Sequence, residues 1–154
     1  MKLNYFLIPL VAFLTAYIGG RITGGGMAWY KAIRLPSWTP PGGVIGAVWT
    51  TIFILSTASA LLIWNGSPHG TRVWLIVALF ILNACANIFW SSLFFGAHHI
   101  YAAFWEALFL ELTVFGLLWL IWPLSLTAAL LLVPYAAWVV VASYLTYSVW
   151  LLNR

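Results

Sequence analysis

Charged residues are scarce in this 154-residue chain. It has six Lys or Arg, two Glu and no Asp, so 5% of its residues are charged, whereas soluble domains carry about 25%. So few charges cannot cover a surface that faces water, which excludes soluble, disordered and coiled-coil proteins. The six basic residues form no run, so the net charge of +4 does not indicate nucleic-acid binding.

Side chains of common catalytic and metal sites are also few. Without Asp there is no Ser-His-Asp arrangement, and the chain has neither G-x-S-x-G nor a phosphate-binding glycine loop. Cys85 is the single cysteine, which excludes an intramolecular disulfide and a multi-cysteine metal site. His98 and His99 have no His or Cys near them in sequence, so we predict exposed histidines and no metal site.

Apolar residues make up 65% of the chain and form runs near the roughly 20 residues with which a helix crosses a bilayer. The runs are apolar on every side, whereas barrel strands alternate apolar and polar residues. We therefore predict an all-α integral membrane protein, with residues 1–154 forming a single domain that is a bundle of five transmembrane helices. Glycine and proline breaks place these helices at about 5–22, 44–64, 73–95, 101–122 and 125–152.

Five spans place the two termini on opposite sides of the membrane, called here side A for the N-terminal side and side B for the other. The first run follows Lys2 as in a signal peptide, but no A-x-A cleavage site follows, so we expect a retained helix. The positive-inside rule makes side B cytoplasmic in an inner membrane. We expect a multi-pass protein of a bacterial cell membrane, inner or outer. The basic residues divide into Lys2 and Arg72 on side A and Arg21, Lys31, Arg34 and Arg154 on side B.

The segment 23–43 is the longest connection, and it lies on side B. It contains Trp29, Tyr30 and the run Pro36-Ser37-Trp38-Thr39-Pro40-Pro41. Prolines restrict the backbone and aromatic rings pack, so we predict an ordered loop. A connection of this length in a small domain is often functional, and we predict that it acts as the lid of a pocket.

Tryptophan is unusually frequent, with 11 residues. Most lie near the ends of spans, where an aromatic belt at the headgroups accounts for them. The exceptions are Trp49, Trp90, Trp105 and Trp138, which lie inside spans. These four either fill the space between helices or line a flat cavity beneath the loop.

Helical spacing places large aromatic and small or polar residues on common faces. Such a mixture suits a ligand cavity, although interhelical hydrogen bonds of Asn and close packing of Ser and Ala produce it as well. Three small-residue spacings, Gly20-x3-Gly24, Gly42-x3-Gly46 and Ser56-x3-Ala60, are weak signals of dimerisation. The three faces are Trp49, Phe53, Ser56 and Ala60; Asn83, Asn87, Trp90 and Phe94; and Tyr135, Trp138, Ala142 and Leu145.

Glu106 and Glu111 are the only acids, and both fall in the fourth span. A charged acid at the bilayer centre costs at least about 2.5–3.5 kcal/mol, so each is a functional candidate. Five residues separate them by about 140° around a helix, which is not a paired carboxylate. Glu106 either meets a ligand, Asn87 or an arginine, or joins helices as a neutral acid, and Glu111 is expected to be protonated. Pro134 predicts a kink in the fifth span.

Three motifs resemble the translocator protein family, whose members are also called tryptophan-rich sensory proteins. They are Pro36-Ser37-Trp38-Thr39-Pro40-Pro41 with Trp49, Asn87-x2-Trp90-x3-Phe94-Phe95-Gly96, and Pro134-Tyr135-x2-Trp138-x3-Ala142 with Asn153. The resemblance implies a five-helix bundle, commonly a homodimer, with a pocket under the first loop. It also implies binding of porphyrins such as protoporphyrin IX and haem, and of hydrophobic drug-like ligands, with no required cofactor.

The resemblance assigns roles to individual residues. In family members a light- and oxygen-dependent breakdown of bound porphyrin has been proposed, and Trp49 and Trp138 match the tryptophans that would take part. Asn87, Trp90 and Ala142 match residues that line the pocket. Sterol-binding relatives carry a Leu/Val…Tyr…Lys/Arg element, from which this chain departs because Arg154 follows Tyr147 after six residues.

The functional prediction is a membrane tetrapyrrole and hydrophobic-ligand binding protein that acts as a sensor or translocator. Two alternatives stay open: light-dependent degradation of bound protoporphyrin IX, and a lipid or sterol carrier. Membrane lipid is the other expected partner. The predicted ligand-binding residues are Trp38, Trp49, Phe53, Asn83, Asn87, Trp90, Glu106, Tyr135, Trp138, Ala142 and Leu145.

Overall fold

The computed structural model describes residues 3–154, and within that range every regular element is a helix. Five spans are long and apolar enough to cross a membrane, as the composition predicts. They are α1 (Asn4–Ala32), α2 (Gly42–Gly66), α3 (Thr71–Ser91) continued by the π-helix η1 (Ser92–Gly96), α4 (Ile100–Ile121), and α5 (Leu126–Leu130) followed by α6 (Val133–Asn153).

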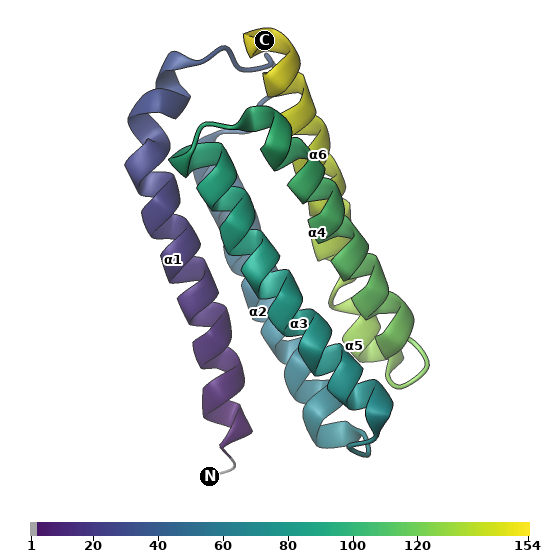
Figure 1. Cartoon of the computed structure of the whole chain (residues 1–154). Helices are drawn as coiled ribbons and strands as arrows, with labels where there is room; N and C mark the ends of the chain where they lie inside the picture. The colour runs from purple at the N-terminus through teal and green to yellow at the C-terminus, as the bar shows by residue number, and fades with distance from the viewer. Residues whose placement is uncertain (1–2) are drawn as a thin grey trace.

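The five spans form one bundle with the chain ends at opposite ends of it (Figure 1). α4 is the most buried span and packs on α3 and α6. α1 stands at the edge of the bundle, against α2, α3 and η1, and leans away from its neighbours toward its N-terminal end (Figure 1). Side B therefore carries the α1–α2 loop, η1 and the end of α6.

The first helix is longer than the sequence indicates, which corrects the predicted end at residue 22 and the predicted loop at 23–43. α1 continues through Gly24, Gly25 and Gly26 to Ala32, so the connection to α2 spans only residues 33–41. The reason is tertiary packing: a Cβ on Gly26 would collide with the Phe95 carbonyl oxygen. Gly26 therefore allows a close approach between helices rather than a turn.

This longer helix also changes the position of Arg21, which the sequence assigns to the side-B loop. Arg21 lies inside α1, several turns before its end, and is exposed. A helix of 29 residues is about 44 Å long, whereas the hydrocarbon core is about 30 Å thick. The basic residues at side B are then Lys31, Arg34 and Arg154, and Lys2 lies outside the described residues.

Gly26→Ala is expected to lower the free energy of unfolding by about 1–3 kcal/mol, because the added methyl group overpacks a contact with backbone atoms. Gly24→Ala is the matched control, since a Cβ there meets nothing within 4 Å and alanine favours a helix over glycine by about 0.5–1 kcal/mol. Thermal unfolding in detergent, followed by circular dichroism, measures both. Equal melting temperatures for the two variants would contradict the packing role of Gly26.

The regular α-helical pattern is interrupted at two places, in η1 at side B and in the fifth span. In η1 the Ala97 N–H donates to the Ser92 carbonyl at 2.8 Å, a wider turn of the kind often found at functional sites. In the fifth span the helix breaks between Leu130 and Val133. Pro134 lies in the first turn of α6, where a residue's N–H has no partner within the helix, so the missing N–H of proline is tolerated. The expected kink is therefore a full break that precedes the proline.

Candidate ligand-binding site

A cavity of about 390 Å³ lies in the side-B half of the bundle, and we call it the side-B cavity. Its volume is within the range of about 300–1,000 Å³ that small-molecule sites occupy. None of its lining residues is Lys, Arg, His, Asp or Glu. Its aromatic lining residues are Tyr30, Trp49, Phe53, Trp90, Phe94, Phe95 and Trp138.

The α1–α2 loop connects two helices at the side-B mouth of this cavity, although none of residues 33–41 lines it. Tyr30 near the end of α1 and Gly42 at the start of α2 both line it, so the nine-residue connection 33–41 joins two points of its rim. Within the loop, Thr39 donates from its N–H and from its hydroxyl to the Pro36 carbonyl, at 3.0 and 2.7 Å. The loop is held by hydrogen bonds, in keeping with the order that the prolines and aromatics predict, but it is much shorter than predicted.

The end of α6 holds the loop in place. The Asn153 side chain accepts from the Arg34 N–H at 3.0 Å and donates to the Arg34 carbonyl at 2.8 Å. Trp38 stacks on Tyr144 of α6 with ring centroids 5.4 Å apart and planes 15° apart. The connection is therefore fastened to α6 at two points, one on each side of the Pro36 turn.

Tryptophan donors in the side-B cavity are unused. The indole nitrogens of Trp90 and Trp138 are buried, and neither has a hydrogen-bond partner within residues 3–154. Trp90 stacks on Phe94 at 5.2 Å and 11°, and Trp49 meets Tyr135 edge to face at 6.0 Å and 75°. A buried N–H without an acceptor costs about 1–3 kcal/mol, so each of these two indoles carries an unsatisfied donor in the wall of the site.

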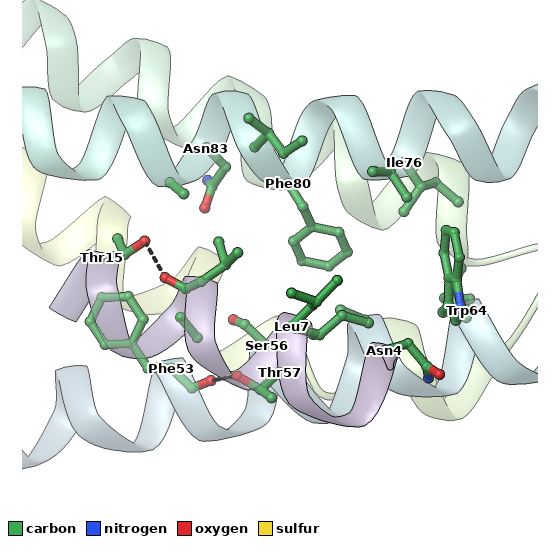
Figure 2. A pocket seen from close by; sticks show the side chains of 18 of the residues that line it. Asn4, Leu7, Thr15, Phe53, Ser56, Thr57, Trp64, Ile76, Phe80 and Asn83 are labelled. Carbon is green, nitrogen blue, oxygen red and sulfur yellow. Dashed lines mark hydrogen bonds between the residues drawn. The ribbon is translucent and has the colours of Figure 1, made fainter. Parts of the chain in front are cut away.

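Most residues of the predicted site meet at this cavity, although they come from three different helices. A second cavity, of about 540 Å³, lies in the other half of the bundle and is called the side-A cavity (Figure 2). The two share only Thr15, Phe53 and Asn87. The predicted residues that line the side-B cavity are Trp49, Phe53, Asn87, Trp90, Trp138, Ala142 and Leu145.

Asn83 and Tyr135 do not line the side-B cavity, although they share helix faces with residues that do. Both border the side-A cavity and belong to a buried network that joins three helices. Asn83 Nδ2 donates to the Thr113 hydroxyl at 2.8 Å, and the Tyr135 hydroxyl donates to Asn83 Oδ1 at 3.0 Å. The sequence left two roles open for Asn83, a contact with a ligand or a hydrogen bond between helices. The structure shows the hydrogen bonds between helices.

Trp38 and Glu106 lie outside both cavities. Trp38 packs on the outer face of α6 through Tyr144, because a loop this short brings its aromatic ring to the rim and not beneath it. Glu106 is buried in α4, and neither its carboxyl oxygens nor those of Glu111 have a hydrogen-bond partner in the part of the chain that the structure describes. The expected contact of Glu106 with Asn87 or an arginine is absent from residues 3–154.

Two further residues lie on the outside of the bundle. Trp105 is 55% exposed on α4 and faces away from the bundle, so of the four tryptophans inside spans it alone is not at the cavity. Cys85 is exposed as well, on the face of α3 that packs against no helix. No group of three or more His, Cys, Asp or Glu is placed to hold a metal ion among the described residues.

Residues of α1 line the side-B cavity, and none of them is among the predicted ligand-binding residues, although those after residue 22 fall in the segment predicted as the lid. A series of small and polar residues spaced by four, four and three is the signal that identifies this face. Its members include the only buried residues of α1 in the described chain. The series is Thr15, Gly19, Thr23 and Gly26.

Comparison with known proteins decides the family. The sequence model of the TspO/MBR family matches residues 6–151. The chain belongs to the TspO/MBR family. It is 33% identical over 153 residues to "Protein CrtK" of Rhodobacter capsulatus, an alignment that covers 99% of this chain and 95% of the relative.

Other TspO/MBR relatives extend across bacteria and animals. Identity is 29% over 153 residues to "Tryptophan-rich protein TspO" of Bacillus cereus, covering 99% of both chains. It is 30% over 150 residues to human "Translocator protein", covering 93% of this chain and 89% of the relative. With five apolar spans, TspO/MBR membership makes the chain a multi-pass integral membrane protein and supports a role as a membrane sensor or translocator.

Proposed function

We propose that this protein binds tetrapyrroles such as protoporphyrin IX or haem, and other flat hydrophobic molecules, in the side-B cavity, and that it senses or translocates them. The observation that carries the proposal is the cavity itself: three indoles, Trp49, Trp90 and Trp138, line one chamber of about 390 Å³ beneath a fastened loop. Family membership supports the sensor or translocator role. Homodimerisation remains a prediction.

The chemistry of a porphyrin matches this chamber in two respects. Its flat apolar ring stacks well on indole faces, at about 0.5–1.5 kcal/mol for each aromatic pair beyond the burial of area. The acidic propionates would lie toward side B, where Lys31 and Arg34 are exposed beside the mouth.

Trp49→Phe and Trp138→Phe are each expected to weaken binding of protoporphyrin IX about 3–10-fold, since each change removes ring area worth up to about 1.4 kcal/mol. Titration of the purified protein with protoporphyrin IX, followed by quenching of tryptophan fluorescence, measures the dissociation constant. Trp119→Phe is the matched control, because Trp119 is 77% exposed and lines neither cavity. If both cavity variants titrate like the parent, the site assignment is wrong.

Light-dependent degradation of the bound porphyrin is a second candidate, because Trp49 and Trp138 line the same chamber and indoles donate electrons. The test is illumination of the protein with protoporphyrin IX in air, with absorption spectra recorded for a new product. W49F/W138F protein and denatured protein are the controls. Loss of porphyrin at the same rate in all three samples, without a new product, contradicts an enzymatic role.

A further inference from the structure

The side-A cavity has no part in the site proposed above. It lies between α1, α2 and α3 and is lined almost wholly by apolar side chains, with Leu7, Ile76 and Phe80 around its middle (Figure 2). None of its 22 lining residues is Lys, Arg, His, Asp or Glu. Ser56 and Ala60, a small-residue spacing that the sequence links to dimerisation, line this cavity instead.

The length of the side-A cavity matches one leaflet of a bilayer. Its α1 wall extends from Leu3 and Asn4 to Thr15, which is about 17–18 Å along the helix at 1.5 Å per residue. Half of the hydrocarbon core is about 15 Å. The chamber therefore begins at the side-A interface and ends at mid-membrane, where Thr15, Phe53 and Asn87 separate it from the side-B cavity.

A polar chamber adjoins its outer end. This chamber, of about 410 Å³, shares Asn4 and Trp64 with the side-A cavity, and we call it the side-A mouth. An apolar chamber one leaflet deep with a polar chamber at the interface has the outline of one lipid chain and its head group. The residues of the side-A mouth are Asn4, Trp64, Asn65, Ser67, Pro68 and His69.

Hydrogen bonds at the side-A mouth indicate what kind of head group fits. Asn4 Nδ2 donates to Asn65 Oδ1 at 3.1 Å, and Asn65 Nδ2 donates to the Leu61 carbonyl at 2.8 Å. Within the described chain these bonds leave Asn4 Oδ1 as an acceptor and the Ser67 hydroxyl as donor and acceptor. No Lys, Arg, Asp or Glu lines the mouth, and His69, the one imidazole there, has its Nε2 2.9 Å from the Trp64 carbonyl oxygen. The mouth therefore offers no carboxylate and no lysine or arginine to pair with a charged head group.

We propose that the side-A cavity and mouth together form a second ligand site, for a single-chain lipid with an uncharged, hydroxyl-bearing head. The acyl chain of the lipid enters between α1, α2 and α3 and reaches Phe53. Its head group stays at the side-A mouth beside Asn4 and Ser67. A hydroxyl both donates and accepts, which matches the groups available there. Water in a cavity needs several polar partners, which the apolar middle of this chamber does not offer, so a lipid chain is its natural occupant in a bilayer.

The experiment uses a monoacylglycerol with a photoactivatable diazirine and an alkyne in its chain, added to the full-length protein in phosphatidylcholine vesicles. After irradiation, peptide mass spectrometry locates the label. We expect it on the halves of α1, α2 and α3 that face side A. We expect unlabelled monoacylglycerol to compete at least fivefold better than the free fatty acid with the same chain. Equal competition, or label spread evenly over all spans, overturns the proposal.

Variants test the chamber itself. Ala60→Leu adds bulk inside the side-A cavity and is expected to reduce labelling at least fivefold, and Ala12→Leu repeats the test from α1. Ala78→Leu is the matched control, because Ala78 is exposed and lines neither cavity. Labelling of both cavity variants at the level of Ala78→Leu overturns the proposal. Protoporphyrin IX titrations of the same proteins test the side-B site separately.

Discussion

Asn83→Ala is expected to lower the free energy of unfolding by about 2–4 kcal/mol, because two buried neighbours each lose a hydrogen bond and an unpaired buried group costs about 1–3 kcal/mol. Asn83 accepts from the Tyr135 hydroxyl and donates to the Thr113 hydroxyl. It is the point at which α3 is tied to both α4 and α6. Thermal or denaturant unfolding of the purified protein measures the loss.

Two further variants make the Asn83 result specific. Thr113→Val keeps the bond between Tyr135 and Asn83 but removes the acceptor of the Asn83 amide, so a smaller loss than that of Asn83→Ala is expected. Asn65→Ala makes the same change at an exposed position that bonds to Asn4, and it is expected to cost less than about 1 kcal/mol. If Asn83→Ala costs no more than Asn65→Ala, the network does not hold the three helices together.

Ala142→Leu is expected to weaken binding of protoporphyrin IX at least tenfold. Ala142 lines the side-B cavity, and a larger side chain there takes space from the ligand, at an overpacking cost of about 1–3 kcal/mol, where 1.4 kcal/mol corresponds to a factor of ten. Fluorescence titration gives the dissociation constant, and the melting temperature shows whether the empty protein is unchanged.

Ala137→Leu serves as the matched control for Ala142→Leu. Ala137 lies on α6 as well, but it is exposed and lines neither cavity, so binding is expected to stay within twofold of the parent. A parent-like dissociation constant for Ala142→Leu in a folded protein contradicts a ligand position in the side-B cavity. An equal loss in both variants points to a general effect on α6.

The candidate site could be predicted in part because the period of a helix brings residues of one face together. Trp138, Ala142 and Leu145 follow that period and line one cavity. The same reasoning placed Tyr135 with these three residues. However, a helix face continues along the whole helix, whereas the side-B cavity covers only part of its length. Phe53 and Asn87 lie where one chamber stops and the other begins, and this boundary depends on α1, for which no site residue was predicted.

The boundary of α1 shows the same limit. Three consecutive glycines normally favour the end of a helix, since glycine has low helix propensity. Here Gly26 contacts Phe95, which is distant in sequence. That contact stabilises the helix only if the residue at position 26 has no side chain. Local propensity contains no information about such a partner, so the loop was predicted too long and Trp38 was predicted inside the site.

Composition and apolar run length by themselves determined the membrane location, the helical class and the five spans, because a bilayer admits long apolar helices and few charges. The order of the motifs determined the family. Only the tertiary structure decided that the interior holds two chambers and not one, that Asn83 joins helices, and that the buried carboxyls of Glu106 and Glu111 face neither chamber. These features depend on the distances between the helices. Contacts between side chains that are far apart in the sequence set those distances, and the sequence of a single helix does not contain them.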